Sequence, residues 1–268
     1  MSSCTRCWPA WLLKRRTHSA VARSVWLEML GKELHLQQMT FVVSGLYVAA
    51  WFAAVLVGES LFPARRAVYM SVATLLHAGA IPLLVGSLAS AEERQLGTLG
   101  WQVLLPIAAW RQWAVKAAVV LLLSLGLAIG VPAILYALFA SGPGPVPLTW
   151  PPAAAIAAVA TLSLYASSLS TNGMRALLAS AAAIGGALLA AHIAMQVMPS
   201  WIPLAWNLPT AAWASLYAAS AAVSAWLLRL GMKNHGSAER DAKRVVKQAA
   251  ALGAVAVVAM LVFAHTPQ

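Results

Sequence analysis

The stretch Ala117–Ser141 reads AAVVLLLSLGLAIGVPAILYALFAS and holds 25 residues without one charged side chain. A helix rises about 1.5 Å per residue and the hydrocarbon core of a bilayer is about 30 Å thick, so about 20 such residues cross it. The apolarity is continuous and does not alternate, which excludes a strand of a membrane barrel. This stretch therefore predicts a transmembrane helix.

Working outward from this run, further uncharged runs of similar character lie on both sides. They are Phe41–Gly58, Ala67–Ala91, Ala153–Met174, Ala176–Met198, Ala205–Leu228 and the shorter Ala249–Ala264. Of all 268 residues, 61% are hydrophobic and only 9% are charged, whereas a soluble domain has about a quarter charged residues. We therefore expect an all-α, polytopic helical membrane protein with six to seven transmembrane helices.

The basic charge is distributed unevenly along the chain. The formal net charge is +11, from 18 Lys and Arg against 7 Asp and Glu. Sixteen of the basic residues fall in 1–40, 92–116, the turn near Arg175, and 229–248, whereas only Arg65 and Arg66 fall between the other pairs of runs. The positive-inside rule then predicts a multi-pass protein of the cytoplasmic (inner) membrane with a cytoplasmic N-terminus. The charge orients the spans, so it does not indicate a nucleic-acid partner.

Four regions follow from these patterns. Residues 1–23 are expected to form a disordered cytoplasmic tail, and the lone pair Cys4 and Cys7 lacks the second pair that a zinc site needs. Residues 24–230 hold the six spans, and residues 231–248 form a basic cytoplasmic segment suited to anionic lipids of the bilayer. Residues 249–268 are expected to form a seventh span with a short exterior tail.

Two segments between the tail and the third span are patterned without being apolar enough to cross. In residues 24–40, SVWLEMLGKELHLQQMT, the spacing of Trp26, Leu30 and Leu34 predicts an interfacial helix, with an extension of the first span as the alternative. Residues 92–116, EERQLGTLGWQVLLPIAAWRQWAVK, carry apolar residues three or four apart and tryptophans suited to a membrane interface. This second segment predicts a short helix along the cytoplasmic face, available to a soluble partner.

The 92–116 segment also carries a resemblance to a known family. Glu93, the Gly97-Thr98-Leu99 step, the pair Leu104-Leu105, the Pro106-Ile107 step and the basic residues Arg111 and Lys116 resemble the cytoplasmic loop of type-2 ABC transporter permeases. The resemblance extends over residues 24–230. It implies a six-span permease domain whose 92–116 loop is a coupling helix seated in a groove of a separate ATP-binding subunit.

The resemblance further implies the partners and the contact residues. The chain would act as a homodimer, or as a heterodimer with a similar permease, in an exporter driven by a cytoplasmic ABC ATP-binding subunit. ATP and Mg would bind that subunit, because this chain has no phosphate-binding loop, and no cofactor is expected on the chain itself. The expected contact residues are Glu92, Glu93, Arg94, Gly97, Thr98, Leu99, Leu104, Pro106 and Arg111.

Two rival functions stay open: a non-transporting membrane scaffold subunit, and an intramembrane enzyme that uses His77 or His192. Each histidine lies inside a predicted span, where it is either a functional group or a hydrogen-bond partner of a neighbouring helix. No predicted span contains Asp, Glu, Lys or Arg, which argues against an ion-coupled transporter. Pro82 and Pro132 predict helix kinks. Helix packing is the expected role of Ser163, Ser167, Ser168, Ser170, Thr171, Gly185 and Gly186.

Overall fold

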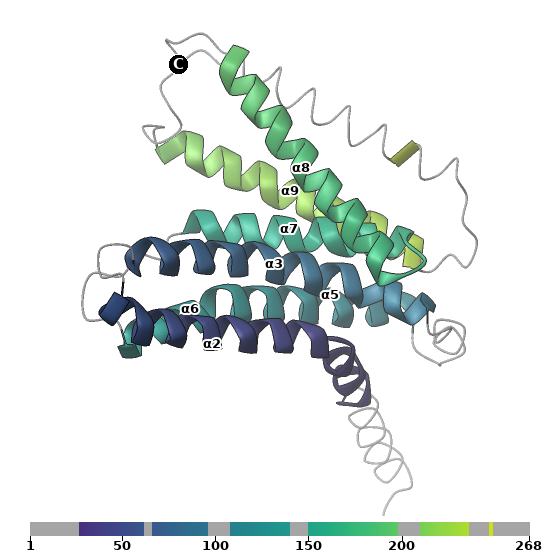
Figure 1. Cartoon of the computed structure of the whole chain (residues 1–268). Coiled ribbons are helices and arrows are strands. Elements are labelled where there is room, and N and C mark those ends of the chain that lie inside the picture. Colours follow the sequence, from purple (N-terminus) through teal and green to yellow (C-terminus); the bar gives the residue numbers. More distant parts are fainter. Residues whose placement is uncertain are drawn as a thin grey trace, which may run out of the picture.

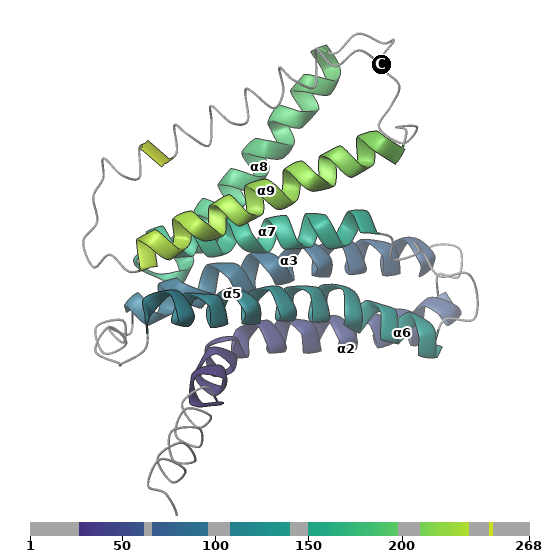
Figure 2. The ribbon, with the colours of Figure 1, turned by 180° about the vertical axis from the view of Figure 1, so that it is seen from behind.

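The computed structural model describes residues 27–61, 66–95, 108–139, 150–197, 210–235 and 247–248. These residues are almost entirely helical and form no strand, which confirms the all-α class. After a first helix at 27–36, the elements are α2 (Gln38–Leu61), α3 (Arg66–Gln95), α5 (Ala109–Leu125), the π-helical turn η2 (Gly126–Gly130), α6 (Val131–Phe139), α7 (Trp150–Leu169), α8 (Gly173–Val197) and α9 (Thr210–His235). The helices lie roughly side by side, with α8 at a larger angle (Figures 1 and 2).

The described part of each of the first six predicted runs lies on helix, apart from residues 170–172 between α7 and α8, and the third run in chain order covers parts of α5, η2 and α6. Among the described residues, three helical stretches are long and apolar enough to cross a membrane: Gln38–Leu56, Val68–Gln95 and Ala109–Phe139. Shorter apolar helices cover Ala153–Leu169 and Gly173–Leu189. These lengths indicate a membrane protein. The expected tail at 1–23, the segment at 249–268 and most of the basic segment at 231–248 lie outside the described residues.

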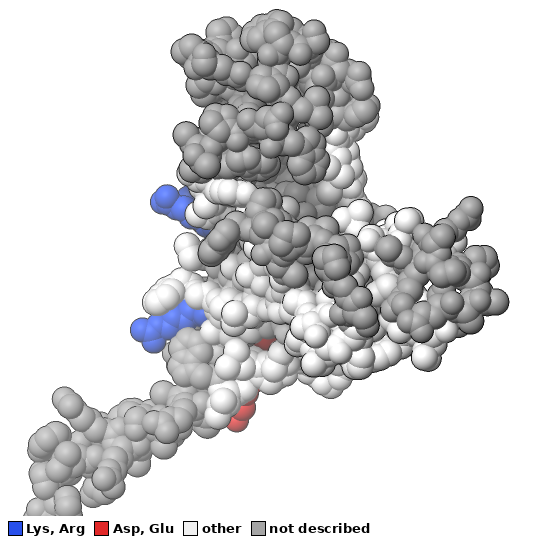
Figure 3. Space-filling view, turned by 90° about the vertical axis from the view of Figure 1, so that its left-hand side faces the viewer, with Lys and Arg blue, Asp and Glu red and all other residues white. Residues whose placement is uncertain are grey.

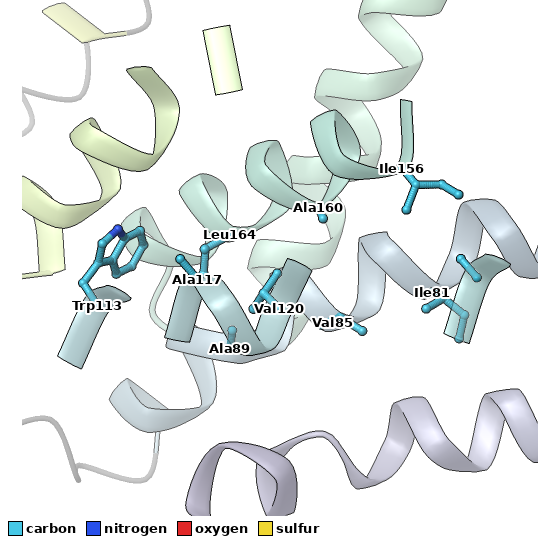
Figure 4. Close-up of a cluster of buried hydrophobic side chains, with 10 residues drawn as sticks. Ile81, Val85, Ala89, Trp113, Ala117, Val120, Ile156, Ala160 and Leu164 are labelled. Atoms are coloured by element: carbon cyan, nitrogen blue, oxygen red, sulfur yellow. The ribbon is translucent and has the colours of Figure 1, made fainter. Parts of the chain in front are cut away.

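Helix α3 occupies the centre of the bundle. It packs against α2 on one side and α7 on the other, and it also contacts α5 and α8 (Figures 1 and 2). Its core side chains meet those of α5 and α7 (Figure 4). The labelled residues in that cluster are Ile81, Val85, Ala89, Trp113, Ala117, Val120, Ile156, Ala160 and Leu164. Helix α9 covers the remaining side of α7.

Small residues set the distance between α3 and α7. A Cβ placed on Gly86 would lie 2.6 Å from Ser163 Cβ and 2.7 Å from the Ala160 carbonyl oxygen, so no larger residue fits there. One turn further along, Ser167 Oγ accepts hydrogen bonds from the backbone N–H groups of Ser90 and Ala91 at 2.9 and 2.8 Å. The predicted packing role of the serines is thus confirmed for Ser163 and Ser167.

The expectation for the α8 glycines is wrong within this chain. A Cβ on Gly185 or Gly186 would meet no atom within 4 Å, and both glycines are exposed. Sequence reasoning took their small size as a packing signal, but the neighbouring helices contact α8 elsewhere.

The first helix and α2 present their polar residues inward. The chain turns at Gln37, so the first helix is separate from α2 and bends away from it (Figure 1). The side chain of Gln37 donates from Nε2 to the Val85 carbonyl of α3 at 3.1 Å. The residues that face the bundle are spaced three or four apart and are all buried: Glu33, Gln37, Thr40, Ser44, Tyr47 and Trp51. The opposite side exposes Leu27, Leu30, Leu34, Met39, Val42 and Leu46. A helix with an apolar outer face and a polar inner face suits lipid surroundings.

Candidate functional site

The expected contact residues fall into three groups. Gly97, Thr98, Leu99, Leu104 and Pro106 lie outside the described residues. Glu92, Glu93 and Arg94 form the last turns of α3, and Arg111 lies in the first turn of α5. Helix therefore extends into the expected 92–116 loop from both sides, because α3 ends at Gln95 and α5 begins at Ala109.

The helices extend beyond the uncharged runs of the sequence. The candidate spans Val68–Gln95 and Ala109–Phe139 include Glu93 and Lys116 near their ends, just outside those runs. The uncharged runs cover only the apolar middle of each helix. Hydropathy alone does not show that a helix continues through charged residues beyond a run when their charges are paired.

An ion cluster of Lys32, Glu33, Glu93 and Lys116 joins three helices at this end of the bundle. Lys116 Nζ lies 2.8 Å from Glu93 Oε2 and 2.9 Å from Glu33 Oε1. Its third hydrogen bond goes to the Ala89 carbonyl of α3 at 2.7 Å. Lys32 Nζ pairs with the other oxygen of Glu93 at 2.5 Å. The two ammonium groups and two carboxylates alternate, so the cluster balances its own charge.

Burial makes the pairing obligatory. The side chain of Glu93 is fully buried and that of Lys116 is 1% exposed, whereas Lys32 at 37% reaches the surface. A buried charge without a partner is costly, and removing one member of a buried pair costs about 3–5 kcal/mol. Burial raises the pKa of Glu33 above its usual value, against the opposing attraction of Lys116, so the carboxylate depends on that lysine for its charge.

Glu93 is therefore buried inside the bundle, and other residues form the surface near it. Glu92 is half-buried, and Arg94 donates from Nη2 to the Asn234 carbonyl of α9 at 3.3 Å. Arg111 is exposed and lies over the ring of Trp110, with 5.4 Å from its Cζ to the ring centroid. Of the described charged residues at the two ends of the loop, Glu93 is thus internal, whereas Arg111 is exposed.

A second polar network attaches α9 to the same end. Asn234 and Gln248 form a reciprocal amide pair with two hydrogen bonds of 3.2 Å, and Tyr165 of α7 donates to Gln248 Oε1 at 2.8 Å. Asn234 Nδ2 also lies 3.4 Å from Ser168 Oγ. These contacts bring residue 248, which precedes the predicted seventh run, to the end of the bundle where α9 ends.

Trp113 contacts α9 instead of the membrane interface expected from sequence. It is 4% exposed, its Nε1 donates to the Leu228 carbonyl at 3.0 Å, and a Cβ on Gly231 would lie 2.5 Å from its ring. The small residue at 231 makes room for the indole. Trp110, one turn earlier, is 57% exposed, so it is not held inside the bundle as Trp113 is.

His235 ends α9 beside these groups. Its ring centroid lies 5.5 Å from that of Trp113. Burial lowers the pKa of His235 to about 4, and the positive charge of Lys116 acts in the same direction. The imidazole is therefore neutral at physiological pH, which avoids adding a further buried positive charge beside Lys116.

Sequence reasoning missed Lys32 and Glu33 as members of this site and treated Lys116 only as a basic residue of the family pattern. A signal was present, because Glu33 begins the series of polar residues spaced three or four apart that continues through Gln37 and Thr40. Such a polar stripe beside exposed leucines marks the inward face of a membrane helix.

The two histidines inside predicted spans differ in what the structure describes. His77 Nε2 lies 3.1 Å from the Leu127 carbonyl, which confirms the expectation that it bonds a neighbouring helix. The side chain of His192 lies outside the described residues. Among the parts of the chain that are described, no three His, Cys, Asp or Glu residues come together in a way that could hold a metal ion.

Comparison with known proteins identifies no relative. No protein-family model, no curated protein and no solved structure matches the chain. The interpretation of its function therefore rests on the sequence pattern and on the geometry of the charged end.

Proposed function

We propose that the chain is the transmembrane permease subunit of a type-2 ABC exporter, driven by a separate cytoplasmic ATP-binding subunit. It spans the cytoplasmic membrane six or seven times with its N-terminus inside, as a homodimer or with a similar permease. The 27–36 helix lies at the inner interface, and the 92–116 loop acts as the coupling helix. ATP and Mg bind the partner subunit.

The observation that carries this proposal is the pairing of Glu93 with Lys116. The two residues flank the 96–107 segment, one at the end of α3 and the other in the second turn of α5. A loop whose two ends are fastened by a buried ion pair cannot hinge freely at its base. Movement of the loop therefore displaces α3 and α5 together.

Glu33 and Lys32 extend this connection to the first helix. Because Glu33 pairs with Lys116 and Lys32 pairs with Glu93, the 27–36 helix moves with the base of the loop. A coupling element needs a docking free energy that differs between the nucleotide states of the ATPase. It also needs a rigid connection, so that its movement displaces the spans. The ion cluster supplies that connection.

The surface at large is consistent with lipid contact. Viewed from the left-hand side of Figure 1, the described surface is almost uncharged, with a few basic and acidic side chains near its edge (Figure 3). Exposed residues on the described helices include Leu46, Leu75, Leu122, Leu138 and Leu188, each more than half exposed. Such positions suit acyl chains, and they support a permease that lies within the bilayer.

Purification of the tagged full-length chain from its native membrane tests the proposal. In mild detergent, mass spectrometry should identify a co-purifying protein with a phosphate-binding loop. Leu99→Asp should abolish that co-purification, because it places a charge on the apolar face expected to enter the partner's groove. Undiminished recovery of the ATPase with Leu99→Asp would contradict the assignment of the coupling helix.

A matched control is Met174→Asp. Met174 is 65% exposed in the first turn of α8, where an acidic residue suits the helix dipole, and it lies outside the 96–107 segment. This variant introduces the same charge at the same end of the bundle and should retain the ATPase. Loss of the ATPase in both variants would show a general effect of charge and would count against a specific contact at Leu99.

A further inference from the structure

The helix of residues 109–139, made of α5, η2 and α6, changes its hydrogen-bond register halfway along. In the π-helical turn Gly126–Gly130, the Val131 N–H donates to the Gly126 carbonyl. An α-helix would direct that N–H to Leu127 instead. The next backbone nitrogen belongs to Pro132, which has no hydrogen to donate. The Leu127 carbonyl is thus left without either its α-helical donor or its π-helical donor.

His77 of α3 supplies the missing donor. Its Nε2 lies 3.1 Å from the Leu127 oxygen, and because a carbonyl can only accept, Nε2 carries the proton. The ring is 4% exposed and stacks on Tyr47 of α2, with centroids 4.1 Å apart and an angle of 8°. The imidazole therefore has little freedom to find another partner.

This hydrogen bond favours one register over the other. In a continuous α register Val131 would donate to Leu127, so the buried Nε2–H of His77 would have to share that carbonyl with a backbone donor. Pro132 disfavours the α register as well, because its ring would meet the carbonyl four residues earlier, at Ala128. The π turn accommodates one extra residue, so a change of register rotates residues 131–139 by about 100° relative to α5.

We propose that the helix of residues 109–139 has two hydrogen-bond registers and that His77 is the positioning residue that selects the π register. In this register Leu135 and Tyr136 of α6 face Tyr47 and Trp51 of α2 and share a buried cluster with them. A return to the α register would turn these α6 side chains away from α2 while α5 stays in place. The turn at 126–130 is then a two-state element between the two halves of the span.

Thiol crosslinking reads the register directly. Phe52 of α2 meets Phe139 of α6, with ring centroids 5.1 Å apart, whereas Leu138 is 68% exposed. The full-length protein, with Cys4→Ser and Cys7→Ser, would carry Phe52→Cys together with either Phe139→Cys or Leu138→Cys. A short bifunctional thiol reagent should join residue 52 to residue 139 and leave residue 138 largely unjoined. Equal crosslinking at both positions with His77 present would overturn the proposal.

Substitution of His77 tests its role. His77→Phe keeps an aromatic ring for Tyr47 and removes the donor. Crosslinking should then move from residue 139 to residue 138, because residue 138 takes the place of residue 139 when the π turn becomes α-helical. His77→Gln retains an N–H donor and should keep the crosslink at residue 139. Undiminished crosslinking at residue 139 with His77→Phe would show that the register does not depend on the histidine. None of these readouts requires an ATPase or a substrate.

Discussion

Lys116 Nζ lies 2.8 Å from Glu93 Oε2, and these two buried residues join the end of α3 to the beginning of α5. The same lysine holds Glu33 of the first helix at 2.9 Å, so one ammonium group connects three segments that are far apart in the sequence. The cluster is internal and its charges balance. Arg111 in the first turn of α5 and Lys233 in the last turn of α9 are exposed and basic.

Lys116→Met should lower the thermal stability of the detergent-solubilised protein strongly. It leaves the buried carboxylates Glu33 and Glu93 without their shared partner, and such a loss costs about 3–5 kcal/mol. Adding Glu33→Gln and Glu93→Gln should recover much of the loss, because no unpaired charge then remains buried. Arg111→Met is the control on the same helix; since Arg111 is exposed, the melting temperature should change little. Equal effects at residues 111 and 116 would refute the ion cluster.

Gly86→Ala should separate α3 from α7 and destabilise the bundle. The added Cβ would lie 2.6 Å from Ser163 Cβ and within 3 Å of the backbone of Ala160 and Leu164, which cannot move as a side chain would. Gly79→Ala is the matched control on α3, because its Cβ would meet nothing within 4 Å and the alanine favours helix by up to about 1 kcal/mol. Thermal melts should show a clear loss for residue 86 alone, and a stable Gly86→Ala protein would be inconsistent with the close crossing.

Helix formation at each of the first six runs could be predicted because length and continuous apolarity determine it. The helix ends could not, since α3 runs through Glu92, Glu93 and Arg94, where Glu93 pairs with Lys116 of α5 and Arg94 donates to a carbonyl of α9. Pro132 predicts an irregularity near its position. His77 contacts the Leu127 carbonyl of the π turn from 50 residues away in the sequence, and no local pattern shows that contact.

The stability of the protein should fall as the pH is lowered from about 6.5 to about 4. Burial lowers the pKa of His235 in the folded state to about 4, from an unfolded value near 6.5, so the unfolded chain binds the proton first in this range. The charged groups that act on the pKa of the imidazole are Lys116 of α5, Glu93 and Arg94 of α3, and Lys32 of the first helix. Thermal melts of His235→Phe should lose part of this pH dependence. An unchanged pH profile would exclude the histidine as its source.

Topology can be measured by thiol labelling in intact cells. In the Cys4→Ser, Cys7→Ser background, Ser141→Cys should react with a membrane-impermeant maleimide from outside, because it lies between the third and fourth expected spans. Lys233→Cys, exposed in the last turn of α9, should react only after permeabilisation. The reverse pattern would invert the orientation, and labelling of both positions from outside would contradict the number of spans between them.

Site-specific photocrosslinking from residue 99 tests the proposed permease function most directly. With a photoreactive amino acid at Leu99 in the full-length chain in its native membrane, the account predicts a crosslink to a protein with a phosphate-binding loop. The same probe at Leu122, which is 72% exposed in the apolar part of α5, should give no such product. Residue 99 joined only to lipid, or to a protein without an ATP-binding fold, would contradict the coupling helix and with it the assignment as a transporter subunit.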